Sequence, residues 1–236
     1  MSDNLKSVFF TVAVAVICSL LLTAAATGLK PLKLRNIKVD RQKNILKSVG
    51  LAQETKPLST AEIESIYNEN IRCFSIDGSG RILAADAAPE NLPICFYIKD
   101  NTPIAYIIPI HTRGLWGKIN GYIAIESDGK TVAGFSVYNH NETPGLGGEI
   151  EKPWFRQNFK GKSIVDKKGN LTSITIAKGK VIDSIPESRR NNYVDGISGA
   201  TLTGKFLSTG LKEILLSYEK VSDQFRDGRI RIPGEK

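Results

Sequence analysis

The chain has 236 residues, of which 41% are hydrophobic and 24% charged, and this composition is typical of a globular protein rather than a disordered one. Its formal net charge of +8 is concentrated in a basic block near the N-terminus, and because no aromatic residue interleaves that block, nucleic acid is not an expected partner. With two histidines, three cysteines and no CxxC pair, a structural metal or haem site is not expected either.

The N-terminal region contains an uncharged run, residues 7–29, that is rich in Val, Ala, Leu and Phe. At about 1.5 Å of rise per residue, a helix of this length covers the roughly 30 Å hydrocarbon core of a bilayer. Ala24-Ala25-Ala26 resembles a signal-peptidase site, but signal peptides usually have apolar regions of only about 7–15 residues, so the run favours a membrane anchor. Cys18 is interpreted as a small apolar residue inside the span. We assign residues 1–29 to an N-terminal segment with a transmembrane helix, and residues 30–58 to a basic stalk or linker.

The charges around this span bear on its orientation. Asp3 and Lys6 precede it, and seven basic residues follow it: Lys30, Lys33, Arg35, Lys38, Arg41, Lys43 and Lys47. Positive charges alone therefore place the globular part in the cytoplasm. The same block is expected to attract anionic lipid or an acidic partner subunit.

The remainder, residues 59–236, is predicted to form one α+β domain built on antiparallel strands. A short helix is expected at 39–49, ended by Gly50, and a capping-type sequence at Ser59 begins another helix that runs to about Asn68. Asp128-Gly129 between two apolar alternations is a strong hairpin signal. Strands are expected at residues 71–76, 81–84, 94–98, 103–109, 121–126, 132–138 and 173–177.

The second half of the domain contains more irregular structure. A loop is expected at 139–148 and a short helix at 154–159, and an apolar stripe from Leu202 to Tyr218 predicts a helix that begins directly after a glycine-rich turn. The polar tail, residues 222–236, is expected to be frayed.

Cys73 and Cys95 lie in two strand-like segments. The sequence does not give the distance between them, so a disulfide in an oxidising compartment and two unpaired buried thiols both fit the pattern.

Two glycine-rich loops are candidate ligand sites, ETPGLGG at 142–148 and DGISGAT at 195–201. Small residues let the backbone approach a ligand, and the second loop opens a helix whose N-terminus favours a phosphate. A nucleophile elbow at Ser198 is rejected because a hydrolase triad needs a histidine after the serine, and both His111 and His140 precede it. On this pattern alone, an ordinary loop followed by a helix N-cap remains the alternative to a phosphate site.

Four segments and the anchor together resemble the C-subunit of the sodium-translocating NADH:quinone reductase. The segments are Gly114-Leu-Trp-Gly117, His140 to Gly148, Trp154 to Lys162 and Asp195 to Thr203. The G-subunit of the related ion-translocating electron-transport complex shares both glycine loops and is the nearest alternative, although its likeness is weaker across the anchor and around Trp116 and Trp154.

This resemblance implies an FMN-binding region at about 112–220. In that family a flavin transferase uses FAD as donor and leaves FMN bonded through its phosphate to the last threonine of Asp-Gly-x-Ser/Thr-Gly-Ala-Thr, which is Thr201 here, with Thr203 as the alternative acceptor. Asp195 and Gly196 are implied in recognition by the transferase. The implied cofactor-binding residues are Glu142, Thr143, Leu146, Gly147, Lys178, Ser198, Gly199, Ala200, Leu202 and Thr203.

The resemblance also implies a function and a location. The chain would be the electron-relay subunit of a sodium-translocating NADH:ubiquinone oxidoreductase in the bacterial inner membrane, single-pass, with other membrane subunits as partners and its domain on the periplasmic side. That side contradicts the count of positive charges. No GxGxxG follows a predicted strand, so the chain is not expected to bind NADH itself. A flavin-binding sensory module and a scaffold protein with a degenerate flavin site are the alternatives from other functional classes.

Overall fold

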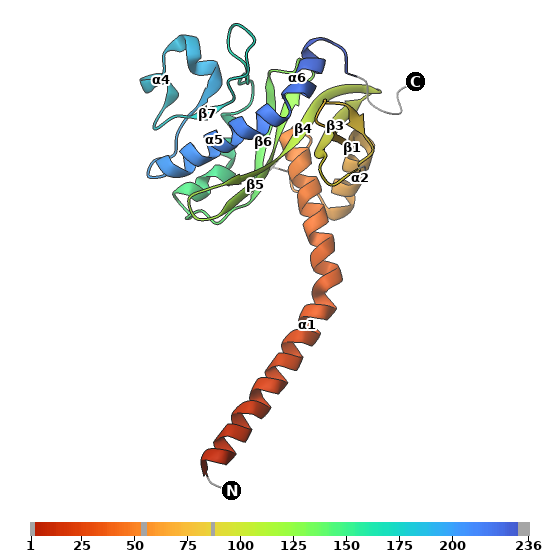
Figure 1. Cartoon of the computed structure of the whole chain (residues 1–236), viewed down its shortest axis with the longest axis vertical. Helices are drawn as coiled ribbons and strands as arrows, with labels where there is room; N and C mark the ends of the chain where they lie inside the picture. Colours follow the sequence, from red (N-terminus) through yellow and green to blue (C-terminus); the bar gives the residue numbers. More distant parts are fainter. Residues whose placement is uncertain (1–2, 53–55, 86–87, 231–236) are drawn as a thin grey trace. The chain divides into compact units, whose positions relative to one another are not determined.

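The computed structural model describes residues 3–52, 56–85 and 88–230 (Figure 1). The chain separates into two compact units, Met1–Asp40 and Arg41–Lys236. The second unit combines a mainly antiparallel sheet with helices, which confirms the predicted α+β class.

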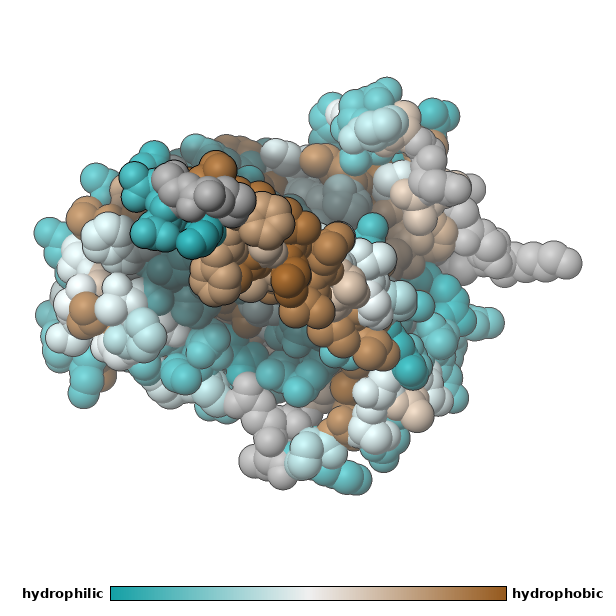
Figure 2. All heavy atoms as spheres, turned by 90° about the horizontal axis from the view of Figure 1, so that it is seen from below, coloured by the Kyte–Doolittle hydropathy of each residue, from teal (hydrophilic) through white to brown (hydrophobic). Residues whose placement is uncertain are grey.

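The first helix, α1, is continuous from Asp3 to Ser48 and contains Pro31. Among the described residues it is the one helix long and apolar enough to cross a membrane. Its exposed hydrophobic side chains form the continuous brown surface in Figure 2, whereas hydrophilic residues dominate the visible face of the second unit. The separate helix predicted at 39–49 is wrong, because these residues continue α1 up to Ser48.

The last turns of α1 belong to the second unit and pack on its sheet. The Ser136 hydroxyl donates a hydrogen bond of 2.9 Å to the carbonyl oxygen of Asn44. A Cβ atom added at Gly134 would lie 2.5 Å from the Ser48 carbonyl oxygen, so only glycine permits this approach of helix and strand. Residues 41–48, which belong to the linker predicted at 30–58, therefore form part of the second compact unit.

Six strands form the main sheet, in the order β2-β1-β3-β4-β5-β6, and every neighbouring pair is antiparallel. The hairpin predicted at Asp128-Gly129 joins β5 to β6, and the Asp128 carboxylate accepts hydrogen bonds from the backbone N–H groups of Lys130 and Thr131 at 2.9 and 2.8 Å. The strands are β1 Ile71–Ile76, β2 Ile82–Leu83, β3 Leu92–Lys99, β4 Thr102–Arg113, β5 Lys118–Glu126 and β6 Val132–Asn139. The first six predicted strands are thus confirmed in order, with β4 and β5 longer than expected.

Helices cover both faces of this sheet. On one face lie the end of α1 and α2, Thr60–Asn70, which begins with the predicted capping box between Ser59 and Glu62. On the other face lie α5, Thr201–Ser217, and α6, Glu219–Arg226 (Figure 1).

The frayed tail predicted from residue 222 is wrong for α6. Phe225 stacks on Tyr106 with ring centroids 4.6 Å apart, and the hydroxyls of Ser222 and Tyr106 are hydrogen-bonded at 2.6 Å. Burial of Val221 and Phe225, four residues apart on one helix face, stabilises a helix that its polar composition obscures. Residues 231–236 of the predicted tail lie outside the described part.

The region between β6 and α5 consists of short elements. β7 pairs in parallel with β8 and is shorter than the strand predicted at 173–177. The elements are η1 Gly147–Glu151, α3 Pro153–Gln157, β7 Thr175–Ile176, α4 Val181–Ser184, η2 Glu187–Asn192 and β8 Tyr193–Val194.

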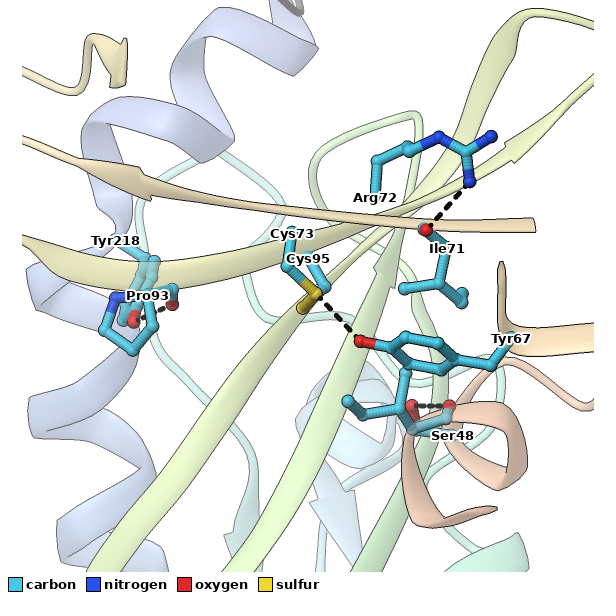
Figure 3. The surroundings of a disulfide bond; sticks show 9 residues. Ser48, Tyr67, Ile71, Arg72, Cys73, Pro93, Cys95 and Tyr218 are labelled. Atoms are coloured by element: carbon cyan, nitrogen blue, oxygen red, sulfur yellow. Dashed lines mark hydrogen bonds between the residues drawn. A yellow bond between two sulfur atoms is a disulfide. The ribbon is translucent and has the colours of Figure 1, made fainter. Parts of the chain in front are cut away.

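Cys73 and Cys95 form a disulfide bond between β1 and β3, where they are direct partners in the strand register (Figure 3). The Tyr67 hydroxyl, from α2, lies 3.1 Å from the Cys73 sulfur atom. Of the two possibilities that the sequence left open, the structure therefore has the disulfide.

Removing this disulfide is expected to destabilise the folded unit. Cys73→Ala together with Cys95→Ala leaves no thiol at either disulfide position and should lower the free energy of unfolding by about 2–4 kcal/mol, because the unfolded chain regains the freedom of the closed loop. Denaturant unfolding of the full chain in detergent measures the change. Cys18→Ala, at an exposed cysteine outside the disulfide, is the control and should have little effect. An unchanged unfolding midpoint in the double variant would contradict the prediction.

Candidate functional site

The DGISGAT loop leads from β8 into α5, and its conformation depends on its glycines. A Cβ at Gly196 would lie 2.1 Å from the Ala177 carbonyl oxygen, so this residue passes directly against the segment that follows β7. Gly199 has a φ of 72°, in the left-handed region that side chains disfavour. Ala200 occupies the N-cap position, and within the described part of the chain no side chain caps α5. The helix therefore begins with Thr201 and has no side-chain oxygen bonded to its first amides.

Thr201 and Thr203 have opposite environments although they are two residues apart. Thr201 is exposed at the first position of α5, whereas Thr203 is 1% exposed. The Thr203 hydroxyl donates a 2.5 Å hydrogen bond to Oε2 of Glu142. Of these two threonines, only Thr201 therefore presents its hydroxyl to an incoming group.

The ETPGLGG loop contacts the DGISGAT loop close to the start of α5. A Cβ at Gly199 would lie 2.7 Å from the Cδ2 atom of Leu146, so the two glycine loops are in contact. The exposed large apolar side chains of the site segments include Leu146 at 43%, Leu202 at 51% and Trp116 at 67%. Leu202 directly follows Thr201 in the chain and Leu146 contacts Gly199, so both supply apolar side chains near the exposed hydroxyl.

The side chain of Glu142 points into the protein. It is 4% exposed, and besides the bond from Thr203 its Oε1 accepts a 3.0 Å hydrogen bond from the backbone N–H of Trp116. A Cβ at Gly114 would lie 2.4 Å from Oε1, and one at Gly147 would lie 2.6 Å from Oε2. No structural role was predicted for Gly114, and the only available signal was its position in the Gly114-Leu-Trp-Gly117 segment.

The other predicted site residues lie around the two loops. Thr143 and Ser198 are exposed, and Gly147 and Ala200 are buried in the loop contacts. Lys178 is exposed, and its carbonyl carbon lies 3.0 Å from the position of a Cβ at Gly196, so it directly adjoins the DGISGAT loop.

Asp195 stabilises the surroundings of the loop. Its Oδ1 accepts a 2.7 Å hydrogen bond from the backbone N–H of Val181, the first residue of α4. Burial lowers the pKa of Lys162, and the negative charge of Asp195 acts in the opposite direction. The Asp195 carboxylate thus connects the DGISGAT loop to the start of α4.

His140 fixes the start of the ETPGLGG loop. Its Nδ1 accepts a 3.1 Å hydrogen bond from the backbone N–H of Glu142, and its Nε2 lies 3.3 Å from the Glu151 carboxylate. Burial raises the pKa of Glu151, but its contacts with Lys152 and His140 outweigh this effect and leave the pKa below its usual value. An ionised Glu151 stabilises the imidazole orientation that accepts from Glu142.

Chemically, this arrangement fits a phosphate-bearing aromatic ligand. The N-terminal end of a helix attracts an anion through its dipole and its amides. An exposed hydroxyl at that end can be esterified, and apolar side chains beside it can contact a planar ring.

Comparisons with known proteins assign the same region of the chain to an FMN-binding domain family. The FMN-binding domain family matches residues 114–216, a range that contains both glycine loops. The C-subunit of the Na(+)-translocating NADH-quinone reductase of Vibrio campbellii is 31% identical, over 86% of this chain and 87% of its own length. The C-subunit of Yersinia pestis is 32% identical, over 84% of this chain and 83% of its own length. The crystal structure of this subunit from Parabacteroides distasonis has a TM-score of 0.70 at 33% identity and covers 82% of this chain and 96% of its own.

Adding a methyl group at Gly147 is expected to disrupt the contact between the loops. In Gly147→Ala the new Cβ would lie 2.6 Å from both the Glu142 carboxylate and the Thr203 hydroxyl, so the free energy of unfolding should fall by about 1–3 kcal/mol. Gly148→Ala is the matched control and should lose less, because its nearest atom, the Thr143 carbonyl oxygen, would lie 3.0 Å away. Denaturant unfolding compares the two variants, and equal losses would contradict the prediction.

Proposed function

The chain belongs to the C-subunit family of the Na(+)-translocating NADH-quinone reductase, and from this premise we propose that it is the electron-relay subunit of such a complex and carries FMN as a phosphoester on Thr201. The family relation rests on relatives more than 30% identical over most of the chain. The observation that carries the choice of acceptor is the exposed Thr201 at the uncapped start of α5, beside the buried and hydrogen-bonded Thr203.

The residues around Thr201 fit the two halves of FMN. The helix N-terminus stabilises the negative charge of the phosphodiester, and Ser198 is exposed within the same loop. Leu146, Leu202 and Trp116 are available to pack against the ring system and to exclude water from it. When bound, FMN supplies reversible electron transfer, and the protein determines its position and its exposure.

Attachment would proceed by group transfer from FAD with a flavin transferase. The Thr201 oxygen forms a bond to the FMN phosphorus, the pyrophosphate bond of FAD breaks, the hydroxyl proton is released, and AMP leaves. In this step Asp195 and Gly196 would contribute to recognition of the acceptor loop, whose shape depends on both residues. In this proposal, NADH is oxidised by other parts of the complex.

We further place the protein in the bacterial inner membrane as a single-pass protein, with its domain on the periplasmic side. The apolar α1 supports the anchor, and the disulfide supports the orientation, because disulfides persist in oxidising compartments and are rare in the cytoplasm. The basic residues after the span favour the opposite orientation, but the positive-inside rule is a statistical tendency.

Replacing the acceptor hydroxyl tests the proposed attachment. Thr201→Val is expected to abolish in-gel flavin fluorescence of the denatured chain, because no oxygen remains to bond the phosphate. Thr209→Val, an exposed threonine later in α5, is the control and should retain the fluorescence. Tandem mass spectrometry of the tryptic peptide 191–205 should locate the FMN phosphoester on Thr201. Modification at Thr203, or an unmodified peptide from cells with an active flavin transferase, would refute the assignment.

Fusions at the C-terminus test the orientation. Alkaline phosphatase is active only after export, so its fusion to the full chain should be active, whereas a green fluorescent protein fusion exported by the same route should stay dark. The reverse result would place the domain in the cytoplasm and overturn the proposed location.

A further inference from the structure

A buried carboxylate joins three separate segments at the candidate flavin site. Oε2 of Glu142 accepts the hydroxyl of Thr203 at 2.5 Å, and its Oε1 accepts the backbone N–H of Trp116 at 3.0 Å. Glu142 thereby connects its own glycine loop to the start of α5 and to the turn after β4. We refer to these two hydrogen bonds as the Glu142 clamp.

The surroundings of the Glu142 clamp are shaped around the carboxylate. Gly114 and Gly147 stand where any side chain would collide with one of its oxygens, at 2.4 and 2.6 Å respectively. The backbone N–H of Glu142 donates a hydrogen bond to His140, which also holds the main chain of Glu142 in place. A buried charge is costly unless it is hydrogen-bonded, so both partners are needed to keep the side chain inside.

Each clamped segment carries a group that is available to the proposed ligand. Trp116 is bonded through its backbone, which leaves its indole ring exposed. Leu146 lies in the loop that Glu142 begins and contacts Gly199. Thr203 lies in the first turn of α5, and its bond orients the turn that starts with Thr201.

We propose that Glu142 is a positioning residue, whose carboxylate holds Trp116, Leu146 and Thr201 in register for attachment of the flavin and keeps the Thr203 hydroxyl away from the transferase. This inference rests on the proposed function and deepens it, since it assigns Glu142 to the organisation of the acceptor rather than to contact with the flavin through its carboxylate.

Two substitutions of different chemistry test the proposal in the full chain, with Trp154→Phe as background so that Trp116 is the single tryptophan. Glu142→Ala removes both hydrogen bonds and should slow flavin attachment by about tenfold or more, the effect expected for losing bonds to a buried charged group. It should also shift the fluorescence emission maximum of Trp116, measured on flavin-free protein from cells without the transferase. Glu142→Gln preserves the size of the side chain and can keep both contacts, because its amide oxygen can accept the Trp116 N–H while its amide N–H donates to the Thr203 hydroxyl. It should therefore restore attachment to within about threefold and return the emission to that of the parent.

A control of equal burial separates positioning from general stability. Ser222→Ala breaks the buried 2.6 Å bond to Tyr106 in α6 and should lower the unfolding midpoint without changing attachment or Trp116 emission. The proposal is overturned if Glu142→Ala attaches flavin at the parental rate with unchanged emission, or if Ser222→Ala slows attachment as much at equal loss of stability. If the parent chain carries no flavin, the proposed function is wrong. The emission of Trp116 in Glu142→Ala would then test separately whether Glu142 positions the turn that carries Trp116.

Discussion

The hydrogen bond between Thr203 and Glu142 joins residues 61 positions apart and is buried from solvent. This bond links the start of α5 to the ETPGLGG loop, and the bond that Oε1 accepts links the loop to the turn that carries Trp116. The two strongest candidate motifs of the sequence thus form one site. Their meeting depends on a carboxylate that is desolvated and therefore needs both partners.

The sheet provides the rigid frame for this junction. α5 packs so closely on β4 that a Cβ at Gly210 would lie 1.7 Å from the Thr112 hydroxyl oxygen. α6 extends the same cover through Phe225 and Ser222, both against Tyr106. Packing of α5 on the sheet and the hydrogen bond from Thr203 to Glu142 therefore both hold the first turn of α5 in place. Thr201 is exposed on this turn.

The sequence predicted those features that depend on neighbouring residues. The capping box at Ser59, the hairpin at Asp128-Gly129 and the helix after DGISGAT are local patterns, and the structure has each of them. The inward direction of Glu142 and the pairing of Cys73 with Cys95 depend on partners far away in the chain, which composition and spacing do not report. α6 was missed for a related reason, because only its packing on Tyr106 distinguishes it from a polar tail.

The cross-link between β1 and β3 makes the stability of the folded unit depend on the compartment that the chain reaches. A copy retained among cytoplasmic reductants lacks this restraint on its unfolded state and spends a larger fraction of its time unfolded. Proteases act on the unfolded fraction, so a copy without the disulfide is removed faster than a copy with it. The disulfide, which lies away from both glycine loops in the sequence, thus links the lifetime of the folded unit to the redox state of its compartment.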